Sequence, residues 1–417
     1  MANSIKTYLK HTAKDFHNQS VNPPVVRAST IIFKSMQDIK KTQKKYLKNP
    51  VSGNFDYGRQ GTSTTYALQQ ILRKLEECYK VYLTPTGFGA VFLSVMSVIE
   101  PEDEILVTDS VYSPTRLLTE TYLKKFNVKA LFYNPSDFND LKSKITKKTK
   151  LIFVENPGSN TFEFQDLSKI TKKTKLIFVE NPGSNTFEFQ DLSKIVKIAK
   201  KKKIYTAIDN TWGTPYFLKP IKLGFDMSIV SATKYYSGHS DVMGGSLAIS
   251  KRVFKLVEPT NKISGLRLGP DDAYLILRGI RTLDVRLDKH QKNALKVANY
   301  LSKQKKVIKV FYPYTKGSIN FKLWKKYYSG ASGLLGFKIR SKNKNSVLKF
   351  VNSLKLFGYG FSWGGFESLA LYQSHEALGK RQFTHLNKDE HVIRMHIGLE
   401  DPNDIINDIK QALRFVK

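Results

Sequence analysis

The pattern of apolar and polar positions divides the chain into three stretches. Residues 1–61 show little long-range periodicity and carry Pro23-Pro24, lysine clusters and the turn signal Gly53-Asn54, which together are typical of an extended arm. From about residue 62, helix-like and strand-like segments alternate, and from about residue 281 a long helical pattern replaces this alternation. We therefore predict an N-terminal arm over 1–61, a large domain over 62–280 and a smaller C-terminal domain over 281–417.

In the predicted large domain, short apolar runs bounded by turn residues predict strands, and longer runs with helical spacing predict helices. The predicted strands span 104–108, 129–133, 204–208 and 227–231. The predicted helices span 64–79, 90–99 and 113–125. This alternation implies an α/β fold with a mostly parallel sheet covered by helices. Beyond residue 281, helices over 283–304 and 345–353 and a strand over 333–339 predict a smaller α+β domain.

One segment of the chain is repeated. Residues 144–168 recur without a change at 169–193, which makes a tandem duplication with a period of 25 residues. Solenoid proteins need three or more stacked repeats, whereas this segment occurs only twice. The pattern therefore indicates a recent in-frame duplication or an artefact of the sequence, not a repeat architecture.

Each copy of the repeat predicts one strand, over 151–154 or 176–179, followed by a Glu-Asn-Pro-Gly-Ser turn. We expect only one copy to take a position in the sheet. Ligands of open α/β sheets bind beyond the carboxyl ends of the strands, so an insert that precedes the strand disturbs the site least. We therefore favour the second copy in the sheet and the first as a surface insert, which costs little loop-closure entropy.

Composition indicates a globular protein and bounds its partners. The chain has 417 residues, 41% of them hydrophobic, and its single cysteine, Cys78, excludes an intrachain disulfide. The net charge of +33 raises the possibility of a nucleic-acid binder, but only 13 of the 68 basic residues are arginines, and the lysines are scattered along the whole chain. This favours solvated surface lysines, as in a compositionally biased proteome. No signal sequence, membrane-spanning run or metal-ligand spacing is found, so we expect a cytoplasmic protein without a metal site, membrane contact or nucleic-acid partner.

One lysine differs in its surroundings from most of the others. Lys234 follows an apolar segment and two hydroxyl residues, Ser231 and Thr233, and precedes the run Ser237-Gly238-His239-Ser240-Asp241. A lysine that attacks a carbonyl needs a lowered pKa and a fixed position, and the hydroxyls suit a phosphate. A surface lysine at the end of a strand explains the segment equally well, so both interpretations stay open on these residues alone.

Three other segments suit a phosphate-bearing aromatic cofactor. Gly87, in Thr86-Gly87-Phe88-Gly89, begins a predicted helix where backbone N–H groups can approach a phosphate. Asp209 and Tyr112 each follow a predicted strand, at the sheet edge where ligands bind. Taken singly, each has an ordinary structural explanation, as a helix start, a turn residue or a packed aromatic ring.

Taken together, these segments resemble the Cys/Met-metabolism family of pyridoxal-phosphate (PLP) enzymes. The family's order of motifs is found between about residues 20 and 412, interrupted only by the repeat. It comprises Tyr57-Gly58-Arg59, Gly87, Tyr112, Asp209-Asn210-Thr211, Ser231-Ala232-Thr233-Lys234 and Arg394. Within the family, the segments 361–368 and 392–401 are most similar to those of the bacterial cystathionine β-lyases. The resemblance implies fold type I of the PLP enzymes, a transferase-like α/β fold.

The resemblance also implies roles for single residues around the cofactor. Lys234 would bind PLP covalently and then remove the Cα proton of the substrate. Asp209 would pair with the pyridinium nitrogen and keep the ring an electron sink, and Tyr112 would stack on the ring as a second catalytic residue. The phosphate would be held by four residues of this chain, namely Gly87, Phe88, Ser231 and Thr233.

Further implied roles concern the neighbouring subunit and the substrate. Tyr57 and Arg59 would reach the phosphate in the site of a neighbouring subunit, which requires at least a dimer and, by family habit, a tetramer. Arg394 would clamp the carboxylate of an amino-acid substrate in a bidentate fork. The remaining substrate-binding residues would be Trp363, Ser362 and the serine of the repeated turn, Ser184 or Ser159, of which we favour Ser184.

The expected activity is the β-elimination of L-cystathionine to homocysteine, pyruvate and ammonia. One departure from the β-lyase pattern is Phe361, where those enzymes carry tyrosine, and it leaves the preferred sulfur substrate open. Alternatives within the family are a cystathionine γ-synthase, a methionine γ-lyase and a cysteine desulfhydrase. An alternative outside enzymology is a binding protein that the repeat has inactivated.

Overall fold

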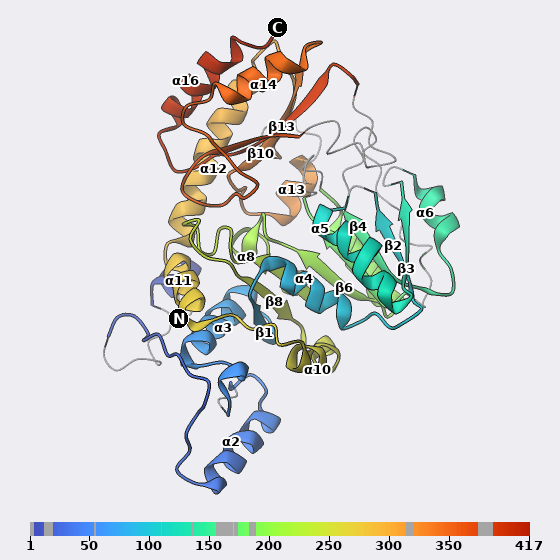
Figure 1. Cartoon of the computed structure of the whole chain (residues 1–417), viewed down its shortest axis with the longest axis vertical. Coiled ribbons are helices and arrows are strands. Elements are labelled where there is room, and N and C mark those ends of the chain that lie inside the picture. The colour runs from blue at the N-terminus through green and yellow to red at the C-terminus, as the bar shows by residue number, and fades with distance from the viewer. Residues whose placement is uncertain are drawn as a thin grey trace. The chain divides into compact units, whose positions relative to one another are not determined.

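The computed structural model describes residues 4–11, 20–53, 56–109, 111–134, 137–155, 170, 174–182, 189–313, 321–373 and 387–417. Figure 1 shows the helices and strands of the chain. Contacts divide the chain into two compact units. Unit 1 comprises Met1–Val98 and Thr214–Asp284, and unit 2 comprises Ile99–Gly213 and Val285–Lys417. The domain boundaries predicted at residues 61 and 280 stay a prediction.

Unit 1 contains three strands of the large sheet, in the order β1-β8-β7. They are β1 (Lys80–Thr84), β7 (Met227–Ser231) and β8 (Gly245–Ile249), and β8 is antiparallel to both neighbours. Helix α4 (Gly87–Met96) packs on β7 and β8, and α3 (Ser63–Glu76) packs on β1 and α11 (Pro270–Ile280). The remaining helices are α1 (Ile5–Lys10), α2 (Met36–Lys48), α8 (Thr214–Phe217), α9 (Pro220–Leu223), α10 (Phe254–Ser264) and the 3₁₀ turns Gly58–Gln60 and Lys251–Val253.

Unit 2 contains five strands of the large sheet, all parallel, in the order β6-β5-β4-β2-β3. They are β2 (Glu104–Thr108), β3 (Lys129–Tyr133), β4 (Thr149–Glu155), β5 (Leu176–Glu180) and β6 (Tyr205–Asp209). The connecting helices are α5 (Ser113–Leu117), the π-helix Leu118–Tyr122, the 3₁₀-helix Leu123–Phe126, α6 (Phe138–Lys144) and α7 (Leu192–Lys201).

Unit 2 also contains a smaller sheet in the order β11-β12-β13-β10-β9. Its strands are β9 (Val307–Phe311), β10 (Leu334–Arg340), β11 (Gly358–Tyr359), β12 (Leu369–Gln373) and β13 (Glu390–His396). The helices of this part are α12 (Leu283–Leu301), α13 (Phe321–Tyr327), α14 (Lys344–Asn352) and α16 (Pro402–Leu413). A mostly parallel large sheet and a smaller second sheet confirm the predicted α/β class. No helix in the described ranges is long and apolar enough to cross a membrane.

Most predicted elements are found within a few residues of their expected bounds, and the differences have local causes. The helix predicted over 113–125 changes from α to π to 3₁₀ geometry. Within it, the hydroxyls of Thr119 and Thr121 donate to carbonyls three and four residues earlier, which competes with regular helix bonding. Helix α2 in the predicted arm was not expected, and none of its residues is buried.

The expectation that only one copy of the repeat lies in the sheet is wrong. Strands β4 and β5 come from the two copies and pair with each other in parallel, from Leu151 opposite Leu176 to Glu155 opposite Glu180. Both strands have a fully apolar centre, and Phe153 packs on Phe178 with ring centroids 4.9 Å apart. A strand that is suited to burial between two parallel neighbours is equally suited to lie beside its own copy, so the sheet gains a strand.

Candidate active site

Gly87 places the N-terminus of α4 against the end of β7 in unit 1. The side chain of Thr86 caps the helix by accepting a hydrogen bond from the Gly89 N–H at 2.9 Å. A Cβ atom at Gly87 would lie 2.5 Å from both Cβ and Oγ of Ser231, so only glycine fits. The first N–H groups of a helix lack helical partners and attract anions. The predicted phosphate residues Gly87, Phe88 and Ser231 therefore surround one helix N-terminus.

Lys234 lies in a tight turn directly after β7. Its N–H donates to the carbonyl of Ser231 at 3.1 Å, and its carbonyl accepts from Gly238 at 2.8 Å. The hydroxyl of Thr233 donates to the Gly244 carbonyl and accepts from the Gly244 N–H, at 3.2 and 3.0 Å. Thr233 thus pins this turn to the residue before β8, and the half-buried Lys234 has a fixed backbone beside Ser231.

Unit 1 holds Tyr57 and Arg59 on a short 3₁₀ turn with both side chains exposed. A Cβ atom at Gly58 would lie 1.9 Å from the carbonyl oxygen of Ala28, so the turn packs directly against an earlier segment of the same arm. The Arg267 side chain donates to the Arg59 carbonyl at 2.6 Å, and Arg59 itself donates to the Lys262 carbonyl at 3.1 Å. The single chain therefore presents both predicted residues outward from a braced turn.

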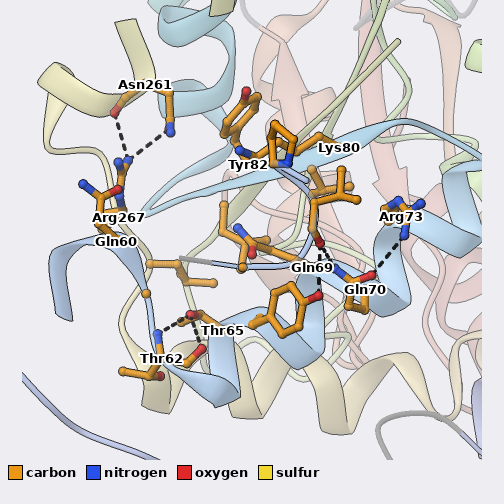
Figure 2. A pocket seen from close by; sticks show the side chains of 18 of the residues that line it. Gln60, Thr62, Thr65, Gln69, Gln70, Arg73, Lys80, Tyr82, Asn261 and Arg267 are labelled. Carbon is orange, nitrogen blue, oxygen red and sulfur yellow. Dashed lines mark hydrogen bonds between the residues drawn. The ribbon is translucent and has the colours of Figure 1, made fainter. Parts of the chain in front are cut away.

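A polar cavity of unit 1 lies behind this turn, lined by residues of the arm, α3, β1 and α10. Figure 2 shows Arg267 bonded to Asn261 on the side of Gln60. Lys80 pairs with Glu258 at 2.9 Å, and burial lowers the pKa of this lysine. The sequence analysis did not anticipate this cavity, because its lining comes from segments that are far apart along the chain.

Asp209 and Tyr112 are both in unit 2. Asp209 is the last residue of β6, opposite Glu180 of β5, and its Oδ1 accepts from the Thr211 N–H at 2.8 Å. Tyr112 precedes α5, and 48% of its surface is exposed. Arg116 donates to both the carbonyl and Oδ1 of Asp109 at 2.7 Å, which fixes the segment that carries Tyr112.

Arg394 is the clearest candidate for binding a carboxylate. It lies on β13 and donates from Nη2 to the carbonyl of Phe361 at 2.7 Å. Burial lowers the pKa of its guanidinium, and the nearby Tyr112 opposes that shift; arginine nevertheless stays charged in proteins. Among the residues that the structure describes, no carboxylate forms an ion pair with Arg394, so its charge has no counterion there.

The segment around Phe361 presents most of its side chains outward. Phe361 is 85% exposed, Ser362 is exposed and Trp363 is half-buried. The serines of the repeated turn, Ser159 and Ser184, lie outside the described residues.

The turn after β5 is anchored by a residue that the sequence analysis did not identify. Asn181 is buried, donates to the Tyr328 hydroxyl at 3.0 Å, and accepts from that hydroxyl at its carbonyl at 2.8 Å. Phe189 and Trp212 pack edge-on against the Tyr328 ring. No sequence signal links Tyr328 to a turn almost 150 residues earlier.

Comparison with known proteins gives matches over nearly the whole chain. A cystathionine beta-lyase of Haemophilus influenzae is 34% identical over 95% of this chain and 94% of its own length. An L-alanine/L-glutamate racemase of Wolbachia pipientis is 32% identical over 94% of this chain and 92% of its own. A crystal structure of cystathionine gamma synthase from Xanthomonas oryzae in complex with cystathionine superposes with a TM-score of 0.82, at 26% identity, and covers 100% of this chain and 99% of that one.

The sequence model of one family, described as Cys/Met metabolism PLP-dependent enzyme, matches residues 6–174 and again 168–414. The two matched segments meet inside the repeat, as expected if one copy is surplus to the family pattern. PLP is thereby confirmed as the cofactor and fold type I as the fold. The chain belongs to the Cys/Met-metabolism family of PLP-dependent enzymes.

Proposed function

We propose that this protein is a carbon–sulfur lyase that cleaves L-cystathionine to homocysteine, pyruvate and ammonia, as a step of methionine biosynthesis. The observation that carries this proposal is the 34% identity to a protein named cystathionine beta-lyase over nearly the full length of both chains. The segment 361–368, whose first residue bonds Arg394, adds to it.

One structural observation shows that residues of this chain fit the phosphate end of the cofactor. The N-terminus of α4 lies so close to Ser231 that no Cβ fits at Gly87, which is the geometry of an anion cradle. Gly87, Phe88, Ser231 and Thr233 would hold the PLP phosphate and Asp209 the ring nitrogen. When bound, PLP supplies an electron sink for a carbanion at Cα.

The protein's own groups would then orient the substrate and move its protons. Arg394 would hold the α-carboxylate in a fork, because its half-buried charge lacks a described counterion and a guanidinium matches a carboxylate in shape. Trp363, Ser362 and Ser184 would complete the substrate side. Lys234 would accept the Cα proton on Nζ, after which the C–S bond breaks and the thiolate leaves as homocysteine. Water then converts the three-carbon remainder to pyruvate and ammonia.

The proposal includes a homo-oligomer in the cytoplasm. Tyr57 and Arg59 are exposed on a turn that their own subunit braces, which supports a role in the site of a neighbouring subunit. A dimer is the smallest assembly that completes such sites, and we infer a tetramer from the family habit.

A racemase is a second candidate, because one relative carries that name at nearly the same identity. Both reactions begin when a base removes the Cα proton, and they differ in whether a leaving group is expelled. We favour the lyase, since the resemblance to β-lyases includes the segment that holds Arg394.

The test is to purify the protein, record its absorption spectrum with PLP, and identify the products from L-cystathionine. We expect a yellow protein that releases homocysteine thiol and pyruvate. Release of 2-oxobutyrate and cysteine would instead assign a γ-lyase. Racemisation of L-alanine without thiol release would assign a racemase, and a colourless, inert protein would leave a binding role.

A further inference from the structure

The tandem repeat adds one strand between Tyr112 and Asp209, the two residues of unit 2 that are proposed to contact the cofactor ring. Tyr112 follows β2 and Asp209 ends β6, and both β4 and β5 lie between them. Neighbouring strands are about 4.8 Å apart, so β2 lies about 14 Å from β6, where a single copy would give about 10 Å. Each added strand also twists the sheet by about 20°.

Neither residue can easily shift to compensate for the wider spacing, because each is held close to the end of its own strand. Tyr112 follows β2 by four residues, and Arg116 locks the intervening Asp109 through its carbonyl and its carboxylate at 2.7 Å. The Asp109 side chain is buried, with only 1% of its surface exposed. Asp209 is itself the last residue of β6 and is held by the Thr211 N–H.

We propose that the added strand holds Tyr112 too far from Asp209 for both side chains to contact one cofactor ring, so that a chain with a single copy binds PLP more tightly. The inference rests on the proposed function, which assigns these residues to the ring. Stacked aromatic rings have centroids about 4.5–7 Å apart. A displacement of about 4.8 Å therefore takes one of the two side chains out of contact with the cofactor ring. The chain with the repeat is then an impaired form of the single-copy enzyme.

A single-copy sheet can form without a change of register. Leu151 pairs with Ile105 of β2, Leu176 pairs with Tyr205 of β6, and Leu151 and Leu176 are opposite each other. Because β4 and β5 are identical and in register, one strand can make both outer pairings. Removing 144–168 or 169–193 gives the same sequence, so the single-copy chain is uniquely defined.

The experiment compares PLP dissociation constants of the full chain and the single-copy chain by absorbance titration of the apo proteins. We expect PLP to bind at least about tenfold more tightly to the single-copy chain, and kcat/KM to rise about a hundredfold, because misplacement by about 1 Å already costs that much. Tyr112→Ala should weaken PLP binding of the single-copy chain about tenfold and weaken that of the full chain by a smaller factor.

A length-matched variant separates spacing from chain length. Leu151→Ser, Ile152→Pro, Phe153→Ser and Val154→Ser together keep the chain length but exclude the first strand from the sheet. This variant should gain PLP affinity as the single-copy chain does, and it decides the matter if the single-copy chain fails to fold. Unchanged or weaker PLP binding in a folded variant overturns the inference. Tighter PLP binding without cystathionine cleavage supports it and rejects only the proposed reaction.

Discussion

Arg394 combines partial burial, a positive charge and a neutral hydrogen-bond partner. Its described hydrogen bond goes to the carbonyl of Phe361, and burial lowers the pKa of its guanidinium. Even partial burial of a charge without a counterion costs free energy, and an anionic ligand can offset that cost. The residue was identified from its place in the family's motif order, and its role in binding the substrate carboxylate stays a prediction.

Replacing Arg394 by lysine should mainly weaken use of the substrate. The charge is kept but the two-pronged hydrogen bond is lost, and a hydrogen bond to a charged group contributes about 1.5–3 kcal/mol. We expect kcat/KM for cystathionine to fall about ten- to hundredfold while the PLP spectrum stays unchanged. Steady-state kinetics measure the effect, and Arg414→Lys on the exposed end of α16 is the matched control. An unchanged KM and kcat would remove Arg394 from the substrate site.

Replacing Lys234 by alanine should abolish the reaction. The change removes both the proposed covalent attachment point of PLP and the proposed base at Cα, so activity should fall by about four orders of magnitude or more. Borohydride treatment followed by peptide mapping should label the natural protein at Lys234 and leave Lys234→Ala unlabelled. Lys251→Ala, at an exposed lysine of the same unit, should be labelled and active. A label on another lysine would show that the turn after β7 was misassigned.

At the scale of elements, polarity patterning predicted those strands that are apolar runs between turn residues. The observed bounds of β2, β3 and β7 are the predicted ones. Strands β1 and β8 were not predicted, although their central residues are buried as well. The repeat was misjudged because a sequence indicates that a segment is suited to a sheet, but not how many equivalent neighbours the sheet will accept.

Helix α3 carries a buried acid that no sequence pattern singled out. Glu76 is fully buried, and its Oε1 accepts from the hydroxyls of Ser228 and Tyr236 at 3.3 and 3.4 Å. Burial raises the pKa of Glu76 to about 8. The folded protein therefore binds this proton more tightly than the unfolded chain does.

This acid should make the protein less stable as the pH rises. A raised pKa in the folded state contributes stability below the ordinary value of 4.5, and that stability is lost as the pH rises through about 8. The loss is on the order of 5 kcal/mol at most. Thermal melts between pH 5 and 9 should show a falling Tm for the natural protein and a flatter profile for Glu76→Gln. Glu102→Gln, at an exposed site, should retain the fall. Parallel profiles for both variants would contradict the assignment.

At the scale of the whole molecule, the sequence suggested candidate residues for the site but not the contacts that brace them. The Arg267 bond to the Arg59 carbonyl joins segments 208 residues apart, and the Tyr328 bond to Asn181 joins segments 147 apart. Such pairs follow from the fold and leave no local pattern. Motif order was sufficient to identify the cofactor, because the same few residues recur in one order for chemical reasons.

Exposure of Arg59 leads to a prediction about assembly. If this side chain completes the site of a neighbouring subunit, each site takes Lys234 from one subunit and Arg59 from the other. Arg59→Ala and Lys234→Ala then affect a given site through different subunits. In a mixed dimer, one site then combines an intact Lys234 with an intact Arg59, and the other site has neither. Random mixing of equal amounts should restore about a quarter of the active sites. Half of the dimers then contain one subunit of each variant, and one of the two sites in such a dimer is intact.

The mixture distinguishes a shared site from a private one. Alone, Lys234→Ala should be inactive and Arg59→Ala weakly active. Co-refolded mixtures should exceed the sum of the two, measured as pyruvate release. If Arg59 served its own subunit, every site in the mixture would lack one residue and no activity would return. Mixing Lys234→Ala with Arg394→Lys provides the control, because both residues are proposed for the same subunit's site and their mixture should not exceed the sum. Restoration in the first mixture only would thus establish that the arm turn, braced by Arg267 but directed outward, belongs functionally to the neighbouring chain.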